Sequence, residues 1–176
     1  MKYYAFVTAM AASGIWLSGA MAQNANRMEQ PTDRTFDAKA AQGGLAEVQL
    51  GNLAIERGMN QRVKDFGRRM VNDHTKINNE LQSVATSQGV TLPTTVDAAD
   101  QAEMTHLSSL SGAAFDRAYM EYMVNVHKQD IAGFEHEANH GNDPQMRAFA
   151  SKTLPILNEH LKLAEQTLAD VRQTGQ

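Results

Sequence analysis

The sequence contains no cysteine among its 176 residues. Disulfide bonds, thiolate metal sites and cysteine nucleophiles are therefore excluded together. Basic clusters are also missing, and the formal net charge of the chain is −4. A protein that binds nucleic acid needs a basic patch to neutralise phosphates. The composition thus argues against a nucleic-acid partner and leaves side-chain packing as the source of stability.

Patterns typical of β-strands are missing as well. No segment alternates apolar and polar residues over several positions, and no Asn-Gly turn lies between β-forming residues. Apolar residues instead recur every three or four positions, as they do on one face of a helix. The clearest such stripe consists of Val63, Phe66, Met70, His74, Ile77, Leu81 and Val84.

The spacing of caps and turns predicts four long helices and one short helix. The expected spans are 35–58, 60–88, 98–110, 113–140 and 144–171. Thr35 is the expected N-cap of the first helix, and Asp143-Pro144 begins the last with an N-cap and a proline at the first helical position. Two short hairpins and a long middle connection favour an all-α four-helix bundle with a crossover between its second and third long helices.

The N-terminal segment has the pattern of a secretory signal peptide. Lys2 precedes an apolar stretch, and Ala20-Met21-Ala22 forms an A-x-A cleavage site. We therefore expect a signal peptide over 1–22, a disordered lead-in over 23–34, a bundle over 35–171 and a tail over 172–176. The mature protein would be periplasmic or secreted, without an integral membrane anchor. The alternative is that the segment is retained as an N-terminal anchor.

The chain contains five segments in a characteristic order: AAQGGLAEVQLGNLA (40–54), VKDFGRRMVNDHTKINNEL (63–81), GVTLP (89–93), FDRAYMEYMVNVHKQDIAGFE (115–135) and FASKTLPILNEHLKLAEQ (149–166). In this combination the chain resembles a bacterial family known as domain of unknown function 4142, often described as predicted outer membrane proteins. The resemblance spans about 35–170 and implies a ferritin-like helical bundle. It implies no particular activity.

Four polar residues are predicted to share one level of the bundle. Glu47, His74, His127 and His160 lie on the four long helices, each well away from the helix ends. Counted from the turns at about 1.5 Å per residue, all four fall within roughly one helical turn of the same level. Metal sites in helical bundles are built from facing helices in this way. If a metal binds at this level, three imidazoles and one carboxylate suit a mononuclear site for one divalent transition metal, Zn or Cu.

A di-iron centre is not expected at this level. Di-iron bundles place a Glu-x-x-His motif on each of two helices, because the glutamates bridge the two irons. Val71 and Leu157 occupy the corresponding positions, three residues before His74 and His160. Both bridging carboxylates are missing, so ferroxidase and oxygenase chemistry are unsupported.

From the sequence we favour a polar network without any metal, and the metal site is its alternative. Buried histidines can bond to Glu47, Tyr119 or Tyr122 and fix the register of the helices. The chain would then be a non-enzymatic helical bundle that acts through contacts with a protein or envelope partner.

A zinc peptidase is a more remote alternative. His136-Glu137-Ala138-Asn139-His140 matches the H-E-x-x-H motif, in which two histidines bind zinc and the glutamate is the base. The motif falls in the last turn before Gly141, which we expect to be exposed. Glu159, the tempting third ligand, is predicted to lie about 24 Å from that turn.

Overall fold

The computed structural model describes residues 31–174, and within this range it contains five α-helices and no β-strand. The helices are α1 (Pro31–Arg57), α2 (Gln61–Ser87), α3 (Ala98–Ser108), α4 (Gly112–His140) and α5 (Pro144–Thr174). The predicted all-α fold is confirmed. The predicted signal peptide and residues 23–30 of the lead-in lie outside the described residues. No helix within the described range is long and apolar enough to cross a membrane.

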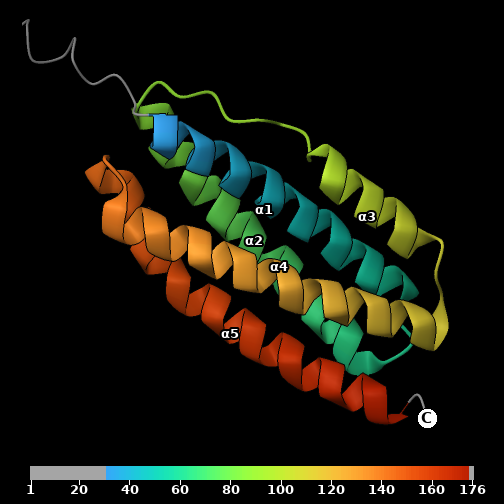
Figure 1. Cartoon of the computed structure of the whole chain (residues 1–176). Coiled ribbons are helices and arrows are strands. Elements are labelled where there is room, and N and C mark those ends of the chain that lie inside the picture. The colour runs from blue at the N-terminus through green and yellow to red at the C-terminus, as the bar shows by residue number, and fades with distance from the viewer. Residues whose placement is uncertain (1–30, 175–176) are drawn as a thin grey trace, which may run out of the picture.

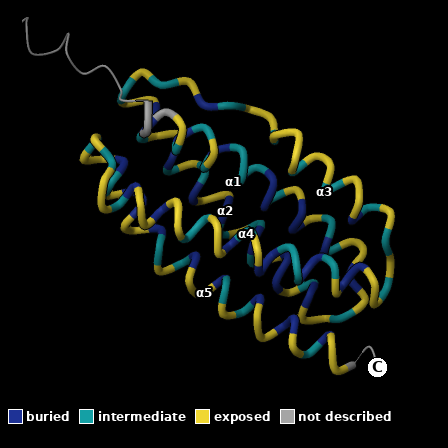
Figure 2. The backbone as a smooth tube through the Cα atoms, in the orientation of Figure 1, coloured by how far each residue is buried: buried dark blue, intermediate teal, exposed yellow. Residues whose placement is uncertain are grey.

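The four long helices form two antiparallel hairpins that lie side by side (Figure 1). α1 pairs with α2 and α4 pairs with α5, while α2 also packs on α5 and α1 on α4. The connection that contains α3 returns along the outside of the bundle, so α4 starts at the same end as α2. This is the predicted crossover. Buried residues lie on the inward faces of the long helices, whereas α3 is mostly exposed (Figure 2).

Two predicted boundaries need correction. α1 already includes residues 31–34, so Thr35 is not its N-cap and the lead-in cannot extend to 34. Pro31 is compatible with a helix start, because the first turn needs no N–H from it and its φ is already helical. α5 continues to Thr174, three residues beyond the predicted end. The predicted cap Asp143 is confirmed, since it accepts hydrogen bonds from the backbone of α5. Asp97 caps α3 in the same way.

Buried aspartates hold the turn of each hairpin. Asp116 on α4 accepts hydrogen bonds from Met59 N at 3.0 Å and Asn60 N at 2.7 Å, in the turn between α1 and α2. Asp33 on α1 accepts from Asn142 N at 3.0 Å and Asp143 N at 3.2 Å, in the turn between α4 and α5. Turn N–H groups have no partner within a helix, so these carboxylates satisfy donors that would otherwise be orphaned. Each hairpin therefore fixes the turn of the other.

The backbones of α1 and α2 approach closely at a pair of glycines. A Cβ atom added to Gly51 would lie 2.7 Å from the carbonyl oxygen of Gly67, and one added to Gly67 would lie 2.6 Å from that of Gly51. Neither position has room for a side chain. This contact sets how close the two helices are and thereby where residues further along α2 project.

The interior consists of two apolar clusters at different heights. One contains Met70 of α2, Met123 of α4 and Ala164 of α5. The other contains Ile77, Phe134 and Leu157 from the same three helices. Along each helix a histidine lies between these apolar residues. A polar layer therefore separates the two halves of the core.

Candidate metal centre

Three histidines meet in the layer between the apolar clusters. His74 on α2, His127 on α4 and His160 on α5 are at most 4% exposed. One ring nitrogen from each lies within 4.8 Å of those of the other two. The ring centroids are 6.0, 5.3 and 5.4 Å apart for the three pairs. The remaining histidines of the sequence, in contrast, are exposed: His106, His136 and His140.

Hydrogen bonds determine which nitrogen is protonated on two of the rings. Nδ1 of His127 lies 2.8 Å from the carbonyl oxygen of Met123, and because a carbonyl only accepts, Nδ1 is the donor. Nε2 of His160 lies 3.0 Å from Oδ2 of Asp73 and donates to it. The other nitrogens, Nε2 of His127 and Nδ1 of His160, then carry lone pairs. Neither has a hydrogen-bond partner, and nor has Nε2 of His74.

Asp73 is itself held in place by charged neighbours. Arg69 donates from Nε to Asp73 at 2.7 Å and pairs through Nη2 with Glu159 at 3.0 Å. Partial burial alone would raise the pKa of Asp73, but the hydrogen bonds from His160 and Arg69 outweigh that effect and lower it. Asp73 is therefore a carboxylate at neutral pH. A carboxylate bound to the outer nitrogen of a metal-ligating histidine orients the ring and increases its basicity.

Burial keeps all three imidazoles neutral. Burial, followed by the nearby His160 and His127, holds the pKa of His74 well below its ordinary value. Burial and the neighbouring His160 lower the pKa of His127 to about 4. Burial also lowers the pKa of His160, although the hydrogen bond to Asp73 opposes this. Neutral imidazole is the form that binds metal ions.

Glu47 on α1 lies beside the cluster but outside it. The residue is 2% exposed, and neither carboxylate oxygen has a hydrogen-bond partner. Oε1 is 3.8 Å from Nδ1 of His127, the nitrogen already bonded to Met123. Burial raises the pKa of Glu47 well above its usual value, and the charges of Asp130 and Asp100 add to the effect. The structure thus brings together the three predicted histidines, while a ligand role for Glu47 stays a prediction.

The two tyrosines considered as partners for the histidines do not bond to them. The hydroxyl of Tyr119 is buried and has no hydrogen-bond partner. Tyr122 donates to Asp100 at 2.8 Å. Neither tyrosine therefore forms a hydrogen bond with the ring nitrogens of the three histidines.

The arrangement is suited to a cation that prefers nitrogen ligands. Three imidazoles favour ions such as Zn or Cu, whereas Mg and Ca prefer oxygen. Nitrogens bound to one tetrahedral zinc ion lie about 3.3 Å apart, so the nitrogens need to approach by about 1.5 Å at most. Within residues 31–174 no other group of three or more potential ligands is this close together.

The H-E-x-x-H string does not form a zincin site. His136 and His140 are exposed, with ring centroids 5.1 Å apart, whereas Glu137 is only 2% exposed. The expectation that the whole turn is exposed is therefore wrong for Glu137. The described residues supply no third ligand near the pair. Glu159 instead pairs with Arg69 on the opposite hairpin.

Sequence reasoning missed Asp73 and Arg69. Their spacing of four residues is common on exposed helix surfaces and signals nothing by itself. Their importance arises because Asp73 reaches across from α2 to His160 on α5, a contact between residues 87 positions apart.

The fold and the cluster together define an all-α four-helix bundle with a buried three-histidine centre. The chain belongs to the family described as domain of unknown function (DUF4142), whose family model matches residues 18–167. The family predicted from the five sequence segments is therefore confirmed. The relation to ferritins stays a prediction.

Two solved structures share the fold. One is described as the crystal structure of a DUF305 fragment from Deinococcus radiodurans; it has a TM-score of 0.71 and 14% sequence identity, and covers 81% of this chain and 98% of its own. The other is described as CopM in the Cu(I)-bound form, with a TM-score of 0.66, 14% identity, and coverage of 80% and 98%. No curated protein matches the chain in sequence. At this identity the likeness concerns the fold.

Proposed function

We propose that the protein binds one transition-metal cation through His74, His127 and His160. The observation that carries the proposal is that three buried imidazoles come together from three helices, and that each has a ring nitrogen without a hydrogen-bond partner. A buried polar atom without a partner costs about 1–3 kcal/mol. A metal ion accepts all three lone pairs at once, which accounts for why these atoms are left unpaired.

The outer hydrogen bonds support the same function. A metal site needs the ring nitrogen that faces away from the ion to be protonated and held by an acceptor. Met123 and Asp73 provide such acceptors for His127 and His160. The solved structure of CopM is a Cu(I)-bound protein of similar fold, which makes copper a first ion to test alongside zinc.

The test is metal binding by the mature chain, produced without a histidine tag. We expect about one equivalent of Zn²⁺, or of Cu(I) under anaerobic conditions, by elemental analysis and by competition with a chelator of known affinity. His160→Asn and His127→Asn are expected to abolish tight binding. His106→Asn is the matched control, because His106 is exposed on α3 and does not belong to the cluster.

Absence of metal binding would favour a purely structural role for the three histidines. If the unsubstituted protein folds fully but shows no affinity for either ion, the proposal fails, and the histidines serve only to fix helix register. Circular dichroism of each variant separates loss of the site from loss of the fold.

We also propose that the protein acts in the bacterial envelope or outside the cell. The support is the signal-peptide pattern over 1–22, which includes the cleavage site Ala20-Met21-Ala22. Fractionation of cells that produce the full chain, with N-terminal sequencing of the product, tests this. A chain that remains in the cytoplasm and begins at Met1 would contradict it.

A further inference from the structure

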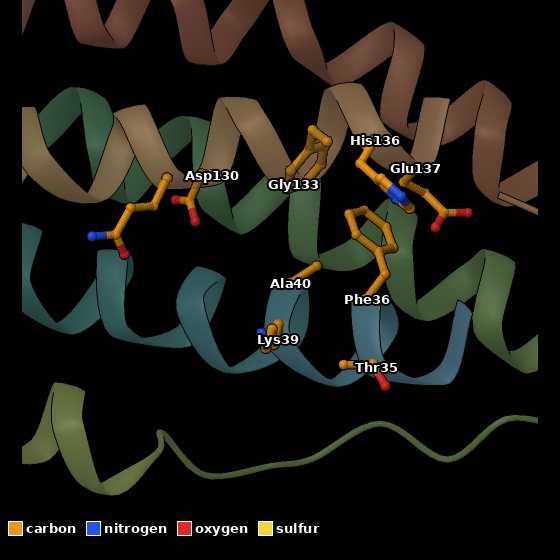
Figure 3. Close-up of a pocket in the computed structure, with 10 residues that line it drawn as sticks. Thr35, Phe36, Lys39, Ala40, Asp130, Gly133, His136 and Glu137 are labelled. Carbon is orange, nitrogen blue, oxygen red and sulfur yellow. The ribbon is translucent and has the colours of Figure 1, made fainter. Parts of the chain in front are cut away.

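A pocket of about 570 Å³ lies between α1 and α4 (Figure 3). Phe36 and Ala40 line it from α1, and Asp130, Gly133 and Glu137 line it from α4. The pocket exists because this side of the bundle is loosely closed: α1 packs far more extensively on α2 than on α4. Gly133 adds to the space, since a Cβ atom at this position would meet no atom within 4 Å.

The seam between the two helices leads from this pocket to the histidines. α1 and α4 are antiparallel neighbours, with Phe36 against Phe134 at the pocket, where the ring centroids are 4.9 Å apart. Further along the seam, Glu47 lies 3.8 Å from His127. Gly43 and Asp130 fall between these two points of contact. A Cβ atom at Gly43 also meets nothing within 4 Å, so the seam stays open there.

Carboxylates occur along the whole seam. Glu137 lies at the outer end, is 2% exposed and has one oxygen without a partner. Asp130 points from α4 toward α1 in the middle. Glu47 lies at the inner end with both oxygens unpartnered. Lys39 is the basic residue that lines the pocket, and its side chain is exposed at the rim. Burial raises the pKa of all three acids, so a cation that enters the seam would meet successive carboxyl oxygens and displace the protons that burial favours on them.

On the other side of the centre, between α2 and α5, a basic residue belongs to the hydrogen-bond network. His160 bonds to Asp73, and Arg69 is bonded to Asp73 and to Glu159. A guanidinium held between two carboxylates offsets part of their attraction for an approaching cation. On the α2–α5 side a cation would thus meet a guanidinium beside Asp73, the carboxylate bonded to His160.

We propose that the seam between α1 and α4 is the route by which a transition-metal cation reaches the three-histidine centre, with Glu137, Asp130 and Glu47 as successive carboxylates along it. This inference rests on the proposed metal-binding function. It assigns a role to the buried acids that the centre itself does not use.

The experiment measures how fast Zn²⁺ moves in and out. Zn²⁺ alone is loaded onto the mature protein, and its transfer to excess chromophoric chelator is followed by stopped-flow absorbance, with the equilibrium affinity measured separately. Gly43→Leu and Gly133→Leu place side chains into the open seam. Both positions are helical and have room for a Cβ atom, and leucine favours helix over glycine, so the variants should fold.

Blocking the seam should slow loading and release equally, because a barrier on the route leaves both end states unchanged. Removing charge should act mainly on loading: we expect Asp130→Asn to slow it by about tenfold and Lys39→Gln to accelerate it. Gln166→Leu is the matched control, since it adds an apolar side chain to the groove between α2 and α5. We expect its rates to equal those of the unsubstituted protein.

The outcomes separate the two proposals. Normal affinity with unchanged rates in both glycine variants, or slowing by Gln166→Leu instead, would overturn the route and leave the metal-binding function in place. Absence of Zn²⁺ binding by the unsubstituted protein would overturn both.

Discussion

Asp73 precedes His74 in the sequence but bonds to His160 on another helix. We predict that Asp73→Asn lowers the affinity for Zn²⁺ by about 10- to 100-fold, because a neutral amide polarises and orients the imidazole less well than a carboxylate. Competition with a chelator measures the change. Asp65→Asn, at an exposed position on the same helix, should leave the affinity unaltered. Equal affinities in the two variants would show that Asp73 does not support the centre.

Glu137 provides a prediction for the dependence of stability on pH. Burial raises its pKa from 4.5 to about 7, and the charges of Asp33 and Asp143 add to this. Between those values the folded protein retains a proton that the unfolded chain has lost, so the contribution of Glu137 to stability decreases as pH rises through this window. Glu137→Gln removes the free-energy cost of ionising this buried carboxyl.

We therefore expect Glu137→Gln to be more stable than the unsubstituted protein at pH 8, by on the order of 2 kcal/mol, and equally stable at pH 4. Urea unfolding at the two pH values measures the difference. Glu135→Gln, at the exposed neighbouring position, is the control and should show no such change. A stability gain of Glu137→Gln that is the same at both pH values would contradict the titration argument.

At the scale of helices, glycine has opposite roles at two positions. Gly51→Ala forces a Cβ atom to 2.7 Å from the backbone oxygen of Gly67 and should destabilise the protein by about 1–3 kcal/mol through separation of α1 and α2. Gly133→Ala meets no atom within 4 Å and should stabilise it by about 0.5–1 kcal/mol, since alanine favours helix. Urea unfolding measures both effects. If the midpoints of Gly51→Ala and Gly133→Ala shift in the same direction, this account of the packing is wrong.

The elements themselves were largely predictable from the sequence. Caps and proline positions depend on residues a few places apart, so the start of α5 at Pro144 and of α3 after Asp97 follow from local pattern. The start of α1 was placed too late. Its first turn is stabilised by a contact between Asp33 and the turn between α4 and α5, more than a hundred residues further along the chain, which local pattern does not reveal.

For the whole molecule, metal binding should raise thermal stability. The centre joins α2 of one hairpin to α4 and α5 of the other, so an ion bound there stabilises the assembled fold. At an ion concentration of 100 times Kd the stabilisation is about 2.7 kcal/mol, or a Tm increase of roughly 5–10 °C. Differential scanning calorimetry with and without Zn²⁺ measures it. His160→Asn should show no increase; a similar shift in that variant would place the stabilising ion elsewhere.

The amino-acid sequence by itself determined the helices, their order, the crossover and the common level of Glu47, His74, His127 and His160, because helical period and rise are properties of the local chain. The tertiary structure alone decided how each helix is rotated about its axis. That rotation turns three imidazoles toward one another and brings Asp73 to His160. It also places Glu47 beside Nδ1 of His127, outside the cluster. Rotation follows from close contacts between distant segments, such as Gly51 against Gly67, and therefore emerges only when the four helices pack together.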